Sequence, residues 1–139
     1  MSAIACEIVK RWEGCKLASY RDGGGVPTIG YGHTRGVTDG LTWTQDQADE
    51  ALVHDLQVAE LAVRHNVKRA LTANQAAALA SFVFNLGETQ FKSSTLLKKV
   101  NEGDDIGAAL ELVKWHHDNG KKIKGLLRRR LDEAALYLA

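Results

Sequence analysis

The chain has 139 residues, a mass of 15.2 kDa and a formal net charge of +1, which fits one globular domain and gives no overall field that would attract nucleic acid. Its 45% hydrophobic and 25% charged residues exclude an intrinsically disordered chain. The first residues contain no long apolar run, so we expect neither a signal peptide nor stable membrane insertion.

An opening helix is predicted from about residue 2 to residue 13, and Gly14 is a favoured stop. Apolar residues recur there at helical spacing, at Ile4, Ile8, Val9 and Trp12. Most of this helix separates Cys6 from Cys15. Their Cα atoms would therefore lie more than roughly 7 Å apart, too far for a disulfide, and we expect two free thiols.

A small β lobe is predicted from about residue 14 to residue 43. Eight of the 13 glycines and the only proline fall between Gly14 and Gly40. Two short extended runs, KLASYRD and VPTIGY, flank the turn signal Gly23 to Gly25. This pattern predicts a β-hairpin, with Pro27 confined to an edge.

A long linking helix is predicted from about residue 44 to residue 65. Thr44 and Gln47 have the spacing of a capping box at its start. The apolar residues that follow with helical period are Ala48, Leu52, Leu56, Ala59 and Val63. At ~1.5 Å per residue, such a helix spans on the order of 33 Å and could join two lobes.

The remainder, from about residue 66 to residue 139, is predicted to form a helical lobe. Thr72 and Gln75 repeat the capping box before ANQAAALASFVFNL, and Gly87 follows as the stop. This segment is apolar on most sides, which is typical of a central helix. Further helices are predicted at STLLKKVN, IGAALELVKWHHDN and GLLRRRLDEAALYL. The predicted class is α+β, mainly α, in a single domain of residues 1–139.

Glu13, Asp22 and Thr28 form the candidate site, with the spacing E-x8-D-x5-T. Glu13 follows Trp12 at a helix end, where apolar surroundings would favour the protonated carboxyl of a general acid. Asp22 precedes a polar glycine turn and would stay ionised, as a charge stabiliser requires. The alternative is structural: Glu13 as a surface residue and Asp22 as a turn-former.

This motif continues as TIGYGHT from Thr28, and with it the chain resembles the phage-type lysozymes, the muramidase endolysins of glycoside hydrolase family 24. Four further blocks match in order: SFVFNLG from Ser81, F-x2-STLL from Phe91, N-x-GD from Asn101 and GLLRRRLDE from Gly125. The resemblance covers nearly the whole chain. It implies a lysozyme-like fold, with a small β-hairpin lobe, a helical lobe, a long helix joining them and a substrate cleft between.

The resemblance also implies roles for the three site residues. Glu13 would be the general acid, Asp22 would stabilise charge or orient the nucleophile, and Thr28 would help to hold the attacking water. The implied reaction is hydrolysis of the β-1,4 bond between N-acetylmuramic acid and N-acetylglucosamine in peptidoglycan, for host cell lysis, without a cofactor. A water between substrate and protein predicts inversion, with the two carboxyls ~6.5–9.5 Å apart.

The expected partners and location follow from this activity. Peptidoglycan glycan strands are the expected substrate, and we expect a monomer that binds no nucleic acid. Without an export segment, the protein would stay in the host cytoplasm before lysis. It would then reach the periplasm and cell wall through a separate holin-type membrane protein.

The histidines are expected to be structural. His33 follows the motif, but a histidine there is more often hydrogen-bonded to a neighbour than used as a base. His116 and His117 are adjacent, and on a helix they would diverge by about 100°. His54 and His65 lie too far apart along their helix to share an ion. We therefore expect no metal site.

The run KKIKGLLRRR could indicate nucleic-acid binding, a membrane-active helix or a solvated face. We expect one of Arg128, Arg129 and Arg130 to turn toward Glu13, as the resemblance suggests, and the other two to face water. Trp43 and Trp115 could stack on sugars, yet large aromatic residues more often belong to the core.

Two other functions fit parts of the sequence. A lytic transglycosylase cleaves the same bond but lets the sugar's own hydroxyl attack, so a residue that holds water, such as Thr28, would have no role. A non-catalytic wall-binding or membrane-active module would use the basic C-terminal helix. The presence of all three site residues argues against that second alternative.

Overall fold

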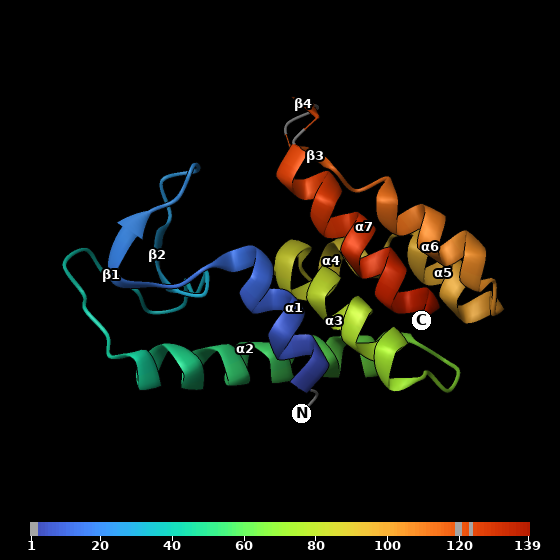
Figure 1. Cartoon of the computed structure of the whole chain (residues 1–139), viewed down its shortest axis with the longest axis horizontal. Helices are drawn as coiled ribbons and strands as arrows, with labels where there is room; N and C mark the ends of the chain where they lie inside the picture. Colours follow the sequence, from blue (N-terminus) through green and yellow to red (C-terminus); the bar gives the residue numbers. More distant parts are fainter. Residues whose placement is uncertain (1–2, 119–120, 123) are drawn as a thin grey trace.

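The structure is a computed structural model that describes residues 3–118, 121–122 and 124–139. Most of the chain is helical, and a small antiparallel hairpin stands to one side of the helices (Figure 1). The long helix α2, Gln45–Asn66, runs from the hairpin side into the helical lobe (Figure 1). This arrangement confirms the predicted α+β class with helices in the majority.

The first helix, α1, spans Ala3–Glu13 and places one face in the core. Its buried residues are Ala5, Ile8 and Val9, which pack with Leu52, Leu56 and Ala77. The helix ends at Glu13, and Gly14 follows with a φ of 66°, in the left-handed region that favours glycine. Cys6 and Cys15 are both free, as predicted.

The hairpin consists of β1, Lys16–Arg21, and β2, Pro27–Gly30, which pair antiparallel. Tyr20 lies opposite Thr28 in this register, and the pairing is irregular between Lys16 and Tyr20. A later segment adds to the same lobe, because Trp43 N donates to the Leu17 carbonyl at 2.8 Å. The glycine turn therefore separates two strands, as the sequence predicted.

The helix α2 begins with the predicted capping box: Thr44 Oγ1 accepts from Gln47 N, and Gln47 Oε1 accepts from Thr44 N. Its apolar stripe is buried along its whole length, at Ala48, Leu52, Leu56, Ala59, Ala62 and Val63. The five positions predicted from periodicity are all in this set. One continuous buried stripe lets this helix contact both lobes.

The helix α3, Ala73–Leu86, is the centre of the helical lobe. Thr72 and Gln75 form the second predicted capping box, and Gly87 ends the helix with a φ of 91°. Every residue from Ala77 to Val83 is buried, because neighbouring helices cover it on several sides. This confirms the central position that its apolar composition predicted.

The described residues of the lobe also form α4, Glu88–Lys92; α5, Thr95–Glu102; α6, Asp105–Val113; and α7, Lys124–Leu138. The helix α4 was not predicted, since its five residues are too few for a helical period to show. The large core of this lobe includes Phe82, Phe91, Leu96, Val100, Leu112 and Tyr137. Within the described part of the chain, no helix has the length and apolar content needed to cross a membrane.

The helix predicted to run to Asn119 is wrong from Lys114 to Asp118, because α6 ends at Val113, and Asn119 itself lies outside the described residues. Trp115 turns inward and packs edge-on against Phe82, with ring centroids 5.6 Å apart, which draws the chain off the helix axis. His117–Asp118 then pairs, as β3, with Lys121–Lys122, as β4. The sequence signal was the Asn-Gly dipeptide between these pairs, which favours a hairpin over a helix.

A buried tyrosine makes the stability of this lobe sensitive to alkaline pH. The Tyr137 hydroxyl donates to Asp105 Oδ1 at 3.1 Å and accepts from Arg69 Nη2 at 3.0 Å. Burial first, and then the hydrogen bond with Asp105, raise the pKa of Tyr137 to about 12. The fold therefore favours the neutral hydroxyl. This contribution is complete below the unfolded pKa of about 10 and is lost as the pH rises toward 12.

We expect Tyr137→Phe to lower the free energy of unfolding by about 1–2 kcal/mol near neutral pH, since Asp105 and Arg69 each lose a hydrogen-bond partner. The difference from the unaltered chain should shrink between pH 10 and pH 12. Urea unfolding of both proteins at a series of pH values measures this difference in the free energy of unfolding. Other tyrosines and lysines titrate equally in both, so a difference that stays constant up to pH 12 would contradict the assignment.

Candidate active site

Glu13 is the last residue of α1, and its carboxyl is held from two sides. Arg129 Nη1, from α7, donates to Glu13 Oε2. On the other side lies the backbone of Gly32, where an added Cβ would be only 2.7 Å from Glu13 Oε1. The side chain of Glu13 is 20% exposed. The acid predicted from the motif is thus fixed where α1, α7 and the β lobe meet.

The loop after β2 brings Gly32 to this place. Ile29 N donates to the His33 carbonyl and His33 N to the Ile29 carbonyl, both at 2.9 Å, so the segment closes into a tight turn. Gly32 has a φ of 78°, which residues with a side chain rarely adopt. A glycine is required both by this conformation and by the nearness of Glu13.

We expect Gly32→Ala to lower the rate of catalysis about 10- to 100-fold, because the new methyl group must displace the Glu13 carboxyl. Gly36→Ala is the matched control. Gly36 has a similar φ of 70°, and among the described residues no atom lies within 4 Å of the position that an added Cβ would take. Both variants carry backbone strain of roughly 1–2 kcal/mol. Equal activity loss in both would show that strain, not contact with Glu13, is responsible.

Asp22 follows β1 and organises the hairpin turn. Its Oδ1 accepts from Gly24 N at 2.8 Å and from Val26 N at 2.9 Å. Asp22 N also donates to the Val26 carbonyl at 3.0 Å. Asp22 is therefore a turn-former, as the structural alternative supposed. Since both bonds use Oδ1, this role leaves the second carboxyl oxygen for another task.

Thr28 lies in β2 and is 3% exposed. Its Oγ1 donates to the Val26 carbonyl at 2.8 Å, which fixes the hydroxyl and leaves the oxygen lone pairs as acceptors. Tyr20 is its partner across the hairpin. Burial raises the pKa of Tyr20, and the negative charges of Glu13 and Asp22 raise it further. The charges of Glu13 and Asp22 thus both act on Tyr20, the residue paired with Thr28 across the hairpin.

Tyr20 was not among the predicted site residues, although the register of the hairpin indicates its position. In a two-stranded antiparallel pair, directly opposed residues have their side chains on the same face. Tyr20 and Thr28 are such a pair. A prediction of the register would have placed Tyr20 beside the proposed water-holding threonine.

The expectation for the three consecutive arginines is partly wrong. Arg129 turns toward Glu13 and Arg128 is exposed. Arg130, expected in water, is fully buried with Glu133. Burial lowers the pKa of Arg130, an effect that Glu133 opposes. Two of three neighbouring arginines can be inward because α7 packs against other helices on more than one side.

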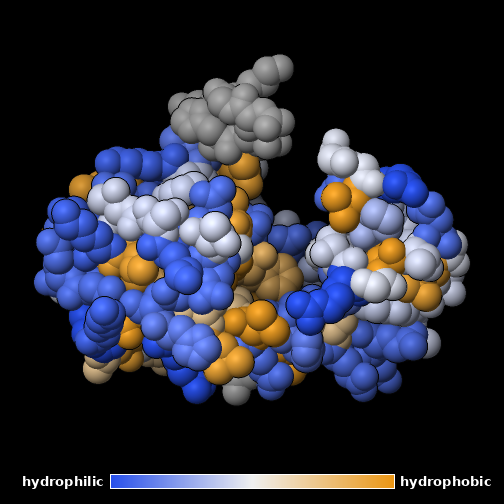
Figure 2. All heavy atoms as spheres, turned by 180° about the vertical axis from the view of Figure 1, so that it is seen from behind, coloured by the Kyte–Doolittle hydropathy of each residue, from blue (hydrophilic) through white to orange (hydrophobic). Residues whose placement is uncertain are grey.

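A cavity of about 280 Å³ lies between the two lobes. Figure 2 shows the surface hollowed there, with apolar side chains gathered at the bottom. Val58, Ala59, Ala62, Val83 and Phe84 form the apolar part of its lining, and His33, Thr34, Arg35, His54, Asp55 and Glu88 the polar part. Gly32 also lines it. The backbone that touches Glu13 is therefore also a wall of this cavity.

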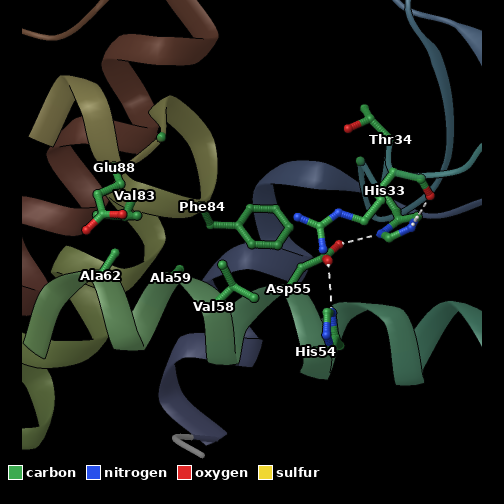
Figure 3. Close-up of a pocket in the computed structure, with 13 residues that line it drawn as sticks. His33, Thr34, His54, Asp55, Val58, Ala59, Ala62, Val83, Phe84 and Glu88 are labelled. Atoms are coloured by element: carbon green, nitrogen blue, oxygen red, sulfur yellow. Dashed lines mark hydrogen bonds and ion pairs between the residues drawn. The ribbon is translucent and has the colours of Figure 1, made fainter. Parts of the chain in front are cut away.

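His33 is held structurally, as expected. Its Nδ1 lies 2.7 Å from Asp55 Oδ2 and its Nε2 lies 2.9 Å from the Arg35 carbonyl. Figure 3 shows Asp55 of α2 between His33 and the more exposed His54. Both ring nitrogens of His33 face oxygen acceptors, so the ring links the β lobe to α2.

Trp43 and Trp115, the tryptophans considered for stacking on sugars, both pack against other side chains. Trp43 contacts His33, with ring centroids 5.3 Å apart, and is half-buried. Trp115 packs on Phe82. Across the residues that the structure describes, no three His, Cys, Asp or Glu side chains are grouped as a metal site would require.

A mainly helical two-lobed fold, with a glutamic acid fixed beside the cavity between the lobes, is that of a glycoside hydrolase of the lysozyme type. Comparisons with known proteins support this class. The family model described as phage lysozyme matches residues 10–133. The chain belongs to the phage lysozyme family, whose members degrade peptidoglycan.

Three similar proteins illustrate the match. The endolysin of Acyrthosiphon pisum secondary endosymbiont phage 1 is 42% identical, over 94% of this chain and 92% of that protein. The endolysin of Salmonella phage P22 is 40% identical, again over 94% of this chain and 92% of that protein. The solved muramidase domain of SpmX from Asticaccaulis excentricus is 37% identical, with a TM-score of 0.92 over 99% of this chain and 97% of that one.

Proposed function

We propose that this chain hydrolyses the β-1,4 bond between N-acetylmuramic acid and N-acetylglucosamine, with Glu13 as the general acid, in one lysozyme-like domain. The observation that carries the proposal is the carboxyl of Glu13, held between Arg129 and Gly32 beside the cavity. A surface glutamate without a catalytic role would need neither the contact with Arg129 nor the contact with Gly32. The muramidase and endolysin relatives support the same chemistry.

The two sides of the Glu13 carboxyl have different roles in this mechanism. Arg129 occupies Oε2, so Oε1 is the oxygen that carries the proton and gives it to the leaving sugar oxygen. Once the proton has left, the guanidinium stabilises the carboxylate that remains. Arg129 therefore lowers the energy of the products of proton transfer.

Asp22 and Thr28 act on the other reacting groups. The negative charge of Asp22 stabilises the positive charge that develops on the sugar in the transition state. Because the Thr28 hydroxyl donates its hydrogen to the Val26 carbonyl, Oγ1 accepts a hydrogen bond from a water. The lone pair of that water then points away from Thr28 and can attack the anomeric carbon, and the proton that the water loses passes to the Asp22 carboxylate, whose second oxygen the turn does not use. Attack opposite the leaving group inverts the configuration.

Mass analysis of digested peptidoglycan tests this function. We expect fragments with reducing muramic acid ends, each heavier by one water than an anhydro form. Anhydro ends would indicate a lytic transglycosylase, and intact glycan strands would indicate a module that only binds the wall. Either result would refute the proposed hydrolysis.

In its biological setting, the proposed enzyme acts as a monomer on the bacterial cell wall to lyse a phage host. Relatives named endolysin support this role. Passage from the host cytoplasm through a holin-type membrane protein stays a prediction. Expression in bacteria, with and without permeabilisation of the inner membrane, tests it: lysis should require permeabilisation, and spontaneous lysis would contradict this route.

A further inference from the structure

Glu133 of α7 is a buried acid that the mechanism above does not use. Its side chain is 0% exposed, and three donors converge on its Oε2. Ser81 Oγ donates at 2.5 Å, Arg130 Nη2 at 2.9 Å and Arg129 Nε at 3.4 Å. Burial raises the pKa of Glu133, while the two arginines and Ser81 lower it. Since all three groups donate to Oε2, this oxygen acts as an acceptor.

The same cluster fixes Arg129 on every edge of its guanidinium group. Nε faces Glu133, and Nη2 donates to the carbonyl and hydroxyl oxygens of Ser81 at 3.3 and 3.4 Å. Nη1 donates to Glu13. With its side chain 4% exposed, Arg129 has little freedom to choose another orientation. Its contact with Glu13 therefore depends on Glu133 and Ser81.

Arg130 contacts Glu133, as Arg129 does, but its guanidinium group does not donate to Glu13. Its Nε lies 2.7 Å from Glu133 Oε1, an ion-pair contact without hydrogen-bond geometry, and its guanidinium carbon lies 5.2 Å from the Phe82 ring centroid. Arg130 is thus a partner of Glu133 in the core. Arg130 therefore has a structural role, whereas Arg129 reaches Glu13, the proposed acid.

The energetics of buried ion pairs argue that this cluster does more than stabilise the fold. Taking charges out of water is costly, so such a pair gains little over well-packed apolar side chains. Its geometric effect is specific, because it aims one guanidinium at Glu13. We propose that Glu133 and Ser81 are positioning residues, which hold Arg129 so that the Glu13 carboxyl presents Oε1 to the substrate.

This inference rests on the proposed role of Glu13, and a double-mutant cycle tests it. Kinetics on soluble, uncross-linked glycan strands are measured for Glu133→Gln, Arg129→Lys and the double variant. We expect Glu133→Gln to lower kcat about 10- to 100-fold with little change in KM, since a displaced acid slows the chemical step. In the Arg129→Lys background the same change should have almost no further effect.

Ser81→Ala is the second variant, in case Glu133→Gln does not fold. It removes one donor to Glu133 and one acceptor for Arg129 while keeping the Ser81 carbonyl. The same coupling to Arg129→Lys is expected, with a smaller loss of kcat. Arg130→Lys is the matched control: it disturbs the other partner of Glu133, so the melting temperature should fall while kcat stays within about threefold.

Two results would overturn the inference. Equal effects in the presence and absence of Arg129 would show that Glu133 and Ser81 act only through stability. A change confined to KM would show that they act on substrate binding. Glu13→Gln in the same assay keeps the two proposals apart, because normal activity of that variant would refute the proposed function itself.

Discussion

Replacing Glu13 with glutamine is expected to lower kcat about 10²- to 10⁴-fold, the contribution typical of a general acid. Glutamine keeps the shape of the side chain, and its carbonyl oxygen can still accept from Arg129. It has no acidic proton for the leaving sugar oxygen. Clearing of outer-membrane-stripped cells and release of reducing sugar ends both measure the loss.

Glu7→Gln is the matched control for this variant. Glu7 lies on the exposed face of the same helix, so the substitution makes the same charge change away from the site. Near-normal clearing is expected for Glu7→Gln, and circular dichroism should show that both variants are folded. A Glu13→Gln protein that also clears cells at a near-normal rate would remove Glu13 from the mechanism.

The second large effect is expected for Asp22→Asn, which should lower kcat about 10²- to 10³-fold. The asparagine Oδ1 can accept the same bonds from Gly24 N and Val26 N, so the hairpin turn remains. Only the negative charge near the reacting sugar is lost. We expect KM to change little, because the charge matters most in the transition state.

Asp39→Asn separates this effect from a general change of charge in the β lobe. Asp39 is exposed and pairs with Arg21 Nη2 at 2.7 Å. A surface pair of this kind contributes little, so the variant should keep its activity. If Asp22→Asn behaved like Asp39→Asn, the role of Asp22 would be limited to forming the turn.

The parts of the fold that the sequence predicted well depend on local signals. The starts of α2 and α3 are examples, since a capping box joins two residues that are three positions apart. The buried stripe of α2 follows from its period in the same way. Such features can be predicted without knowing which helix packs against which.

The surroundings of Glu13 could not be predicted in this way. Arg129 is separated from it by 116 positions, and only the packing of α7 decides which of three consecutive arginines reaches it. Glu13 was expected beside apolar surface, but it lies against this guanidinium and the backbone of Gly32. Arg130 was misplaced for the same reason, because its partners Glu133 and Phe82 are brought together only by tertiary structure.

The stereochemistry of the first product tests the central claim most directly, namely that Glu13, Asp22 and Thr28 direct a water onto the anomeric carbon. Proton NMR of freshly cut muropeptides, recorded before mutarotation, identifies the anomer that forms first. Attack of a water opposite the leaving group predicts the α anomer from the β bond. An initial β anomer, a glycosyl-enzyme trapped on Asp22, or a 1,6-anhydro product would contradict the mechanism.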